Sequence, residues 1–112
     1  MATGNFSLYQ GDTKEITVTV LDADDNAVDI TSATISWKAS RNVNSDAELT
    51  KDTTSGGVSI TDASGGKFKI TITAGDTARM NGDYYHEAQI TFSDGSVSTV
   101  LTGTMTVRPG LI

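Results

Sequence analysis

Apolar residues recur at every second position in several stretches of this chain, and that period sends alternate side chains to opposite faces of a β-strand. The stretch KEITVTVL is the clearest case, because Ile16, Val18 and Val20 fall on one face while threonines fill the other. The same alternation runs through NFSLYQ, ATISWKAS, KFKITIT, DYYHEAQITF and VSTVLTGTMTV. Helical periodicity is nearly absent, so the pattern predicts an all-β chain.

Turn signals separate these stretches and leave no room for long connecting helices. Gly56-Gly57 marks one turn, and Asp94-Gly95 marks a tight hairpin between the last two strands. Seven or eight short strands without helical crossovers predict an immunoglobulin-like antiparallel β-sandwich with one short helical turn. The length of 112 residues fits a single domain, residues 1–112.

The helical turn is expected in TAGDTARMNG, residues 73–82. Thr73 or Asp76 is a suitable N-cap, and Gly82 is a suitable end, so the segment predicts one or two helical turns. Disorder is expected only in the first four residues and in the loop NVNSDAE, residues 42–48.

Two aromatic residues are expected in the core. Trp37 and Phe68 each occupy the apolar phase of a strand, so both should lie between the two sheets. Sandwiches of this type often bury a tryptophan in the third strand and place a tyrosine corner before the penultimate strand, where Tyr84 is the candidate. The position two residues later is a cysteine in antibody domains and is His86 here.

His86 is the chain's only histidine and therefore the first residue to consider for catalysis. On a strand, however, Tyr85 and Glu87 point to the opposite face, so the histidine has no acid beside it. No Gly-x-Ser-x-Gly segment is present to expose a nucleophile. We therefore predict a semi-buried, hydrogen-bonded histidine, no catalytic residues, and a protein that is not an enzyme.

The segment DADDN contains the best candidate metal ligands. Asp22, Asp24 and Asn26 have the one-three-five spacing of a calcium loop. The sixth position of such a loop should be glycine but is Ala27, and the twelfth should be glutamate but is Ala33. We favour a solvated connection between strands over a metal site, and we predict no cofactor.

Composition and charge limit the classes of partner. The net charge is −6, the pI is about 4.4, and the eight lysines and arginines are scattered, so no basic stripe is available for a row of phosphates. The chain shows neither a signal peptide nor an apolar run long enough to span a bilayer. Nucleic acid and membrane are therefore not expected as partners. The absence of cysteine leaves the fold to packing alone.

The last residues, VRPGLI, are candidates for contact with a partner. Pro109 removes a backbone donor, so the last strand should end near Val107. Arg108, Leu111 and Ile112 could then dock on a neighbouring subunit, or the two apolar residues could fold back over their own domain. Both alternatives are open at this point.

Several segments together resemble one known family. They are Gln10–Thr13 before the second strand, Val28–Thr31 before the tryptophan strand, Gly82–Tyr84 with Glu87, and the final Asp-Gly hairpin leading to Thr99. In this series the chain resembles the N-terminal immunoglobulin-like domain of phage baseplate upper proteins and related phage tail modules. The resemblance spans nearly the whole chain.

The resemblance implies a structural role in a virion. The expected function is that of a non-enzymatic tail, neck or baseplate adaptor, made in the host cytoplasm and assembled with other virion proteins and copies of itself around a symmetry axis. Capsid decoration is the nearest alternative. A bacterial surface module that binds carbohydrate or calcium is an alternative from a different class.

Overall fold

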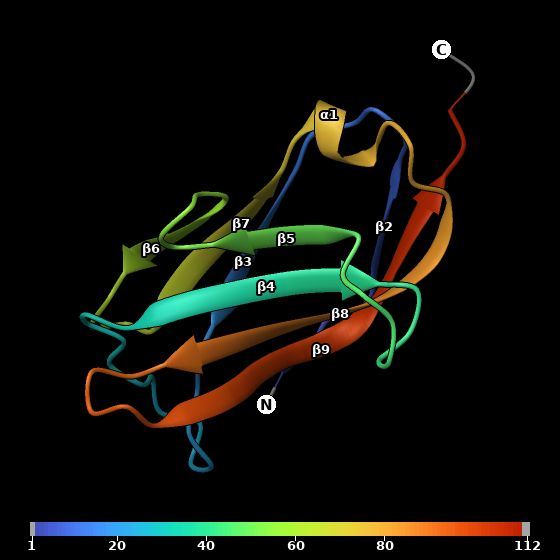
Figure 1. Ribbon diagram of the computed structural model, residues 1–112. Helices are drawn as coiled ribbons and strands as arrows, with labels where there is room; N and C mark the ends of the chain where they lie inside the picture. The colour runs from blue at the N-terminus through green and yellow to red at the C-terminus, as the bar shows by residue number, and fades with distance from the viewer. Residues whose placement is uncertain (1, 111–112) are drawn as a thin grey trace.

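The computed structural model describes residues 2–110, which form nine strands and one short helix (Figure 1). Two β-sheets face each other, and their apolar sides meet between them. The elements are β1 (Ala2–Thr3), β2 (Phe6–Tyr9), β3 (Lys14–Thr19), β4 (Thr34–Ser40), β5 (Leu49–Asp52), β6 (Val58–Asp62), β7 (Lys67–Ile72), α1 (Ala74–Thr77), β8 (Gly82–Thr91) and β9 (Val97–Arg108).

The order of the strands confirms the predicted fold class. One sheet has the order β1-β9-β8-β4-β5, with β2 also paired to β9, and the other has the order β3-β7-β6. The chain thus passes from one sheet to the other after β2, β3, β5 and β7, as in immunoglobulin-like sandwiches. β1 and β2 both pair with β9, one after the other, and so act as one interrupted edge strand. Counted in this way, residues 2–110 form eight strands.

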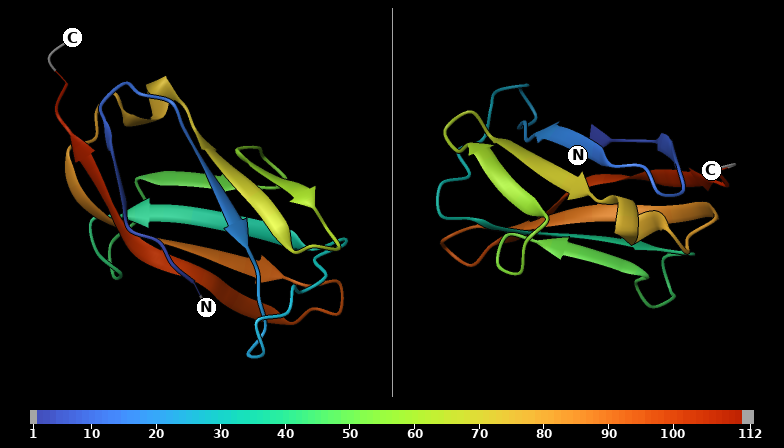
Figure 2. Two further views of the ribbon diagram at one scale, coloured as in Figure 1. Left: turned by 180° about the vertical axis from the view of Figure 1, so that it is seen from behind. Right: turned by 90° about the horizontal axis from the view of Figure 1, so that it is seen from above.

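The prediction of antiparallel pairing is wrong for this edge strand. Both β1 and β2 run parallel to β9, whereas β8 and β9 pair antiparallel across the predicted Asp94-Gly95 hairpin (Figure 2). A short turn forces antiparallel pairing only between strands that are adjacent in sequence. The first and last strands have no such turn between them, so their relative direction follows from the path of the whole chain.

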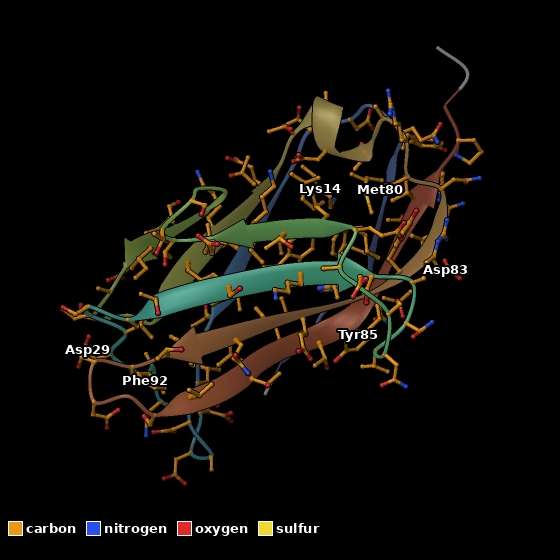
Figure 3. All side chains as sticks on the ribbon, viewed as in Figure 1. Lys14, Asp29, Met80, Asp83, Tyr85 and Phe92 are labelled. Atoms are coloured by element: carbon orange, nitrogen blue, oxygen red, sulfur yellow. The ribbon has the colours of Figure 1, made fainter. Side chains whose placement is uncertain are left out.

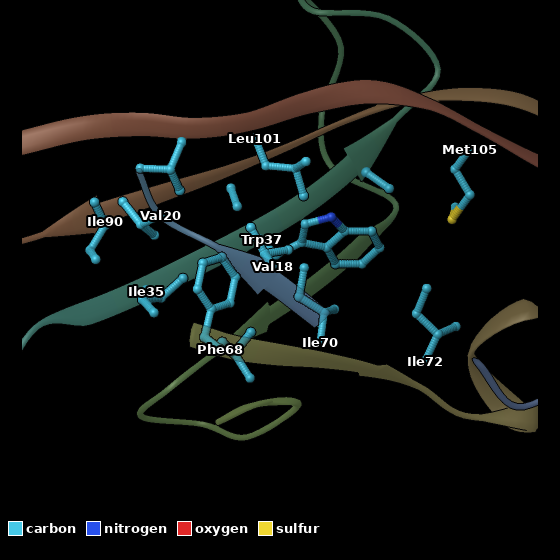
Figure 4. Packing of buried hydrophobic residues seen from close by; sticks show 14 of the residues in the cluster. Val18, Val20, Ile35, Trp37, Phe68, Ile70, Ile72, Ile90, Leu101 and Met105 are labelled. Carbon is cyan, nitrogen blue, oxygen red and sulfur yellow. The ribbon is translucent and has the colours of Figure 1, made fainter. Parts of the chain in front are cut away.

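The core contains the two aromatic residues predicted for it. Trp37 and Phe68 are both fully buried. They come from opposite sheets and point into the core between them (Figure 4). Ile35 and Ala39 accompany Trp37 on β4, and Ile70 and Ile72 accompany Phe68 on β7. Every second residue of these strands is therefore buried, as the alternation of the sequence predicts.

The helix begins where predicted but ends earlier. Thr73 is the N-cap, and its backbone N–H donates to Asp76 Oδ2 at 2.8 Å. Helix α1 stops at Thr77 instead of Gly82, because the buried Thr77 hydroxyl accepts a hydrogen bond from the Gly11 N–H at 3.0 Å and the chain then turns into β8. Gly82, with φ at +95°, begins β8.

Asp76 also joins the two sheets. Its Oδ2 lies 2.7 Å from Lys51 Nζ on β5, and both side chains are largely buried. Burial would raise the pKa of Asp76, but the hydrogen bonds from Lys51 and Thr73 outweigh it and hold this pKa below its ordinary value of 3.8. The stabilisation is present above the ordinary pKa and is lost as the pH falls through the folded-state pKa.

We therefore expect Asp76→Asn to lower the free energy of unfolding by about 1 kcal/mol at neutral pH, the usual cost of losing a helix cap or a partly buried ion pair. The difference from wild type should vanish in acid, where the protonated Asp76 side chain is as neutral as the asparagine that replaces it. Melting curves across this pH range test the expectation. Asp25→Asn is the matched control, since Asp25 is exposed and its φ of +63° suits asparagine. Equal losses in the two variants would contradict the assignment.

Candidate functional site

His86 lies on the inner face of β8 and is fully buried. Trp37 Nε1 donates a hydrogen bond to His86 Nδ1 at 3.1 Å, so Nδ1 is the unprotonated nitrogen. His86 Nε2 lies 2.5 Å from the carbonyl oxygen of Gly4, and it therefore carries the proton and donates it. The neutral imidazole joins β4, β8 and the N-terminal edge strand in one run of hydrogen bonds.

The residues around the imidazole explain how a backbone carbonyl reaches it. Gly103 on β9 is the register partner of His86, and a Cβ at this position would collide with the carbonyl of Gly4. The Phe6 ring meets the imidazole edge to face, with 5.1 Å between ring centroids. A glycine in the middle of β9 therefore makes room for the N-terminal strand to contact His86.

Burial lowers the pKa of His86, and the hydrogen bond to Gly4 opposes this only in part. The folded state thus favours the neutral ring. This contribution to stability is complete above the unfolded-state pKa of about 6.5 and is lost as the pH falls below it.

Within residues 2–110, the imidazole forms hydrogen bonds with the Trp37 indole and the Gly4 carbonyl and with no acidic side chain. The Tyr85 hydroxyl donates to Glu87 Oε2 at 2.8 Å on the other face of β8, as the alternation of the strand predicts. Glu87 in turn raises the pKa of Tyr85. Both nitrogens of His86 are bonded, one to the buried Trp37 and the other to the half-buried Gly4, so the imidazole holds the three strands together. It is more deeply buried than the semi-buried position predicted.

Tyr84 forms the predicted tyrosine corner. Its hydroxyl oxygen accepts a hydrogen bond from the Asn81 N–H at 3.0 Å, which fixes the chain just before β8. The Arg41 guanidinium lies over the Tyr84 ring, with its central carbon 4.2 Å from the ring centroid. This contact covers the outer end of the core.

The structure uses the candidate calcium loop differently. Asp22 Oδ1 accepts hydrogen bonds from the N–H groups of Asp24 and Asn26, at 2.9 and 3.0 Å. These bonds close a tight, exposed turn between β3 and β4, with Asp25 at a φ of +63°. Within residues 2–110, no three histidine, cysteine or acidic side chains come together as a metal site would require.

We expect this turn to be independent of calcium. Calorimetric titration should show no binding tighter than about millimolar, the weak end of protein calcium sites. Asp22→Ala should instead lower stability by about 1 kcal/mol, because it removes the acceptor of two backbone N–H groups. Micromolar calcium binding that is lost in Asp24→Ala would contradict this expectation.

The predicted partner-contact residues are only partly described. Arg108 is exposed at the end of β9, opposite Tyr9, and its carbonyl accepts a hydrogen bond from the Gln10 N–H at 2.8 Å. Leu111 and Ile112 lie outside the described residues, so the choice between docking and folding back stays a prediction.

Sequence reasoning missed the N-terminal residues that contact His86. The first four residues were expected to be disordered, but Ala2–Thr3 form β1 and Gly4 is bonded to both His86 and Thr102. The predicted disordered loop at 42–48 is likewise a hydrogen-bonded turn, in which the Asn42 N–H donates to the Ser45 hydroxyl oxygen at 3.1 Å. The sequence does contain a signal for the contact between Gly4 and His86. Gly103 interrupts the apolar phase of its strand, and a glycine in a strand often marks the close approach of another backbone.

No protein-family model matches the chain, and no curated protein sequence matches it. None of the helices formed by residues 2–110 is long and apolar enough to cross a membrane.

Proposed function

We propose that this protein is a non-enzymatic structural module of a phage virion, an adaptor of the tail, neck or baseplate that acts through protein–protein contacts. The family resemblance of the sequence supports this role, and so does the fold, since immunoglobulin-like sandwiches present loops and strand edges on a rigid core. The position of His86 supports it as well, because both ring nitrogens of the chain's only histidine are occupied by hydrogen bonds to Trp37 and Gly4.

The observation that carries the proposal is the position of the exposed apolar side chains. The domain measures 44 × 26 × 25 Å, and β9 runs along its length. Tyr9 is 54% exposed beside the end of β9, and Val97 is 55% exposed at its start. Figure 3 shows the two ends, one marked by Met80 and Asp83 and the other by Phe92 and Asp29.

Both ends therefore offer an apolar contact to a neighbour. At the Val97 end, Leu21 is also exposed and lies beside an open groove of about 380 Å³ between β3 and β9. At the other end, Tyr9 lies next to Arg108. Exposed aromatic and apolar residues next to charged ones are typical of protein interfaces. An elongated domain with a contact at each end suits a connector.

The test is incorporation into particles. Tagged chain would be produced in cells that make the virion, and purified particles would be probed for the tag and labelled for electron microscopy. Label at the tail, neck or baseplate would support the adaptor role. Label over the head would replace it with capsid decoration, and absence from purified particles would contradict both.

Point variants make the test specific to the two ends. Tyr9→Ser and Val97→Ser should each reduce incorporation about tenfold, the effect of losing roughly 1.4 kcal/mol of binding energy. Their melting temperatures should stay near that of wild type, because both side chains are exposed. Thr17→Ser is the control, since Thr17 is exposed in the middle of β3, away from both ends, and the change removes one exposed methyl group. An equal loss in the control would argue against contacts at the ends.

A further inference from the structure

The N-terminal edge strand is bound to β9 with a gap in its ladder. Ala2 pairs with Leu101 and Phe6 with Met105, 99 positions later in both cases, but the pairing is interrupted at Gly4 and Asn5. Other bonds fill the gap. The Gly4 N–H donates to the Thr102 carbonyl at 2.8 Å, and the Thr104 N–H donates to Asn5 Oδ1 at 2.9 Å.

The Gly4 carbonyl is the group in this gap that depends on His86. It accepts the proton of Nε2, and this bond exists together with the Trp37 bond only while the ring is neutral. A protonated imidazole carries hydrogen on both nitrogens, so its Nδ1–H would face the Trp37 N–H. Protonation therefore breaks the bond from Trp37 and buries a positive charge, while Nε2–H still donates to Gly4. The force that favours release of the N-terminal strand is the hydration of this charge.

Among the described groups around the ring, the Gly4 carbonyl offsets that charge, but only in part. The neighbours on the adjacent strands and on the same face of β8 are uncharged: Trp37 and Ala39 of β4, Phe6 of β2, Gly103 of β9, and Tyr84 and Ala88 of β8. Tyr84 is bonded to the Asn81 backbone. The Lys14 ammonium on β3 lies 6.0 Å from the centroid of the Phe6 ring that contacts the imidazole, and its charge is positive. No ion pair within residues 2–110 involves the imidazole.

Water can reach the charged ring most easily from the edge of the sheet. On that side Gly4 and Phe6 contact the imidazole, and they belong to an edge segment that pairs with β9. Beyond Tyr9, the chain is tied down again, since Gln10 Nε2 donates to the Met80 carbonyl at 2.6 Å and the Gly11 N–H donates to Thr77. Residues 2–9 are thus the unit that can leave.

We propose that protonation of His86 releases residues 2–9 from β9, and that the uncovered edge of β9 then accepts the same segment from a second copy of the chain. The inference rests on the proposed function as an assembling module, and it names one partner and the condition for binding it. The pivot is the loop after Tyr9, where Gly11 has a φ of +81°.

The edge of β9 is shaped for this particular segment. An incoming strand must bring a carbonyl to His86 over the missing side chain of Gly103, an acceptor to the Thr104 N–H, and apolar side chains to the sites of Phe6 and Leu8. The segment from a second copy supplies all of these. Exchange therefore remakes the same contacts between chains, the usual basis of strand swapping.

The first experiment measures release in the wild-type protein by hydrogen exchange. Lowering the pH from about 7.5 to about 5, across the range in which a histidine titrates, should reduce the protection factor of the Thr104 amide about tenfold. The control is the same amide in His86→Gln, whose side chain does not titrate, and there its protection should respond less to acid than in wild type. No change in wild type, or an equal change in the variant, would overturn the release.

The second experiment detects exchange with two single-cysteine variants of this cysteine-free chain. Ser7 and Thr106 are register partners, and neighbouring strands about 4.8 Å apart suit a disulfide. Ser7→Cys and Thr106→Cys chains with different tags would be mixed, held in acid, returned to neutral pH and oxidised. The acid step should raise the yield of the mixed cross-linked dimer about tenfold, following the loss of protection.

A His86→Gln background is the matched control, because glutamine keeps a donor and an acceptor but does not titrate. Its dimer yield should not respond to acid. A response equal to that of wild type would overturn control by His86, and a wild-type chain that yields no mixed dimer after acid would overturn exchange even if the glutamine variant fails to fold. These assays use the purified chain alone, so they can fail while particle labelling succeeds, and the reverse.

Discussion

Replacing Trp37 with alanine should lower the free energy of unfolding by about 3–5 kcal/mol, the range for removing a large aromatic side chain from a core. Trp37 is fully buried, and its loss would leave a cavity between β4 and the opposite sheet. It would also leave His86 Nδ1 without its donor. A domain of this size has only about 5–15 kcal/mol in total, so the variant should be close to unfolding at room temperature.

Denaturant titration followed by circular dichroism measures this loss, since the variant has no tryptophan left to report by fluorescence. Val43→Ala is the control, because its side chain is mostly exposed and its removal should change stability by less than about 0.5 kcal/mol. A loss below about 1 kcal/mol in the Trp37 variant would mean that the indole does not support the core.

Gly103→Ala should cost about 3 kcal/mol, at the upper end of the range for inserting a methyl group into a packed site. The new Cβ would collide with the backbone of Gly4, which cannot give way as the end of a flexible side chain could. The N-terminal strand would be pushed off β9, and the buried Leu8 and half-buried Phe6 would lose their cover.

The matched control is Gly75→Ala. Gly75 lies within α1 and has open space around the position of a Cβ, so alanine there should raise stability by up to about 1 kcal/mol. Melting followed by Trp37 fluorescence compares the two variants, since Trp37 is the only tryptophan. A Gly103→Ala protein that melts like wild type would show that the contact between Gly4 and His86 is not required.

Local alternation made the β-strands predictable. Ile16, Val18, Trp37 and Phe68 are on the inner faces because a strand repeats every two residues, and that rule needs no knowledge of the partner strand. Tyr84 was predictable for a similar reason, since a tyrosine corner depends on its own neighbourhood in the chain. The predicted fold class followed from these segments and from the turns between them.

The partners of His86 were not predictable in the same way. Trp37 and Gly4 are 49 and 82 positions away, and their contact depends on the register of three strands. The segment NFSLYQ shows the alternation of a strand, but nothing in it specifies β9 as the partner, and residues 2–4 carry no such pattern. The helix end was missed because Thr77 bonds to Gly11, another contact that spans a large part of the chain.

The parallel pairing of β2 with β9 also sets the order in which the domain can be completed. During synthesis, residues 2–9 leave the ribosome long before β9, the strand that covers them. Contacts between such distant residues form slowly, because a long loop must close before they can. Phe6 and Leu8 therefore stay uncovered until the chain is finished through β9, and a nascent chain interrupted before Val97 would still expose both.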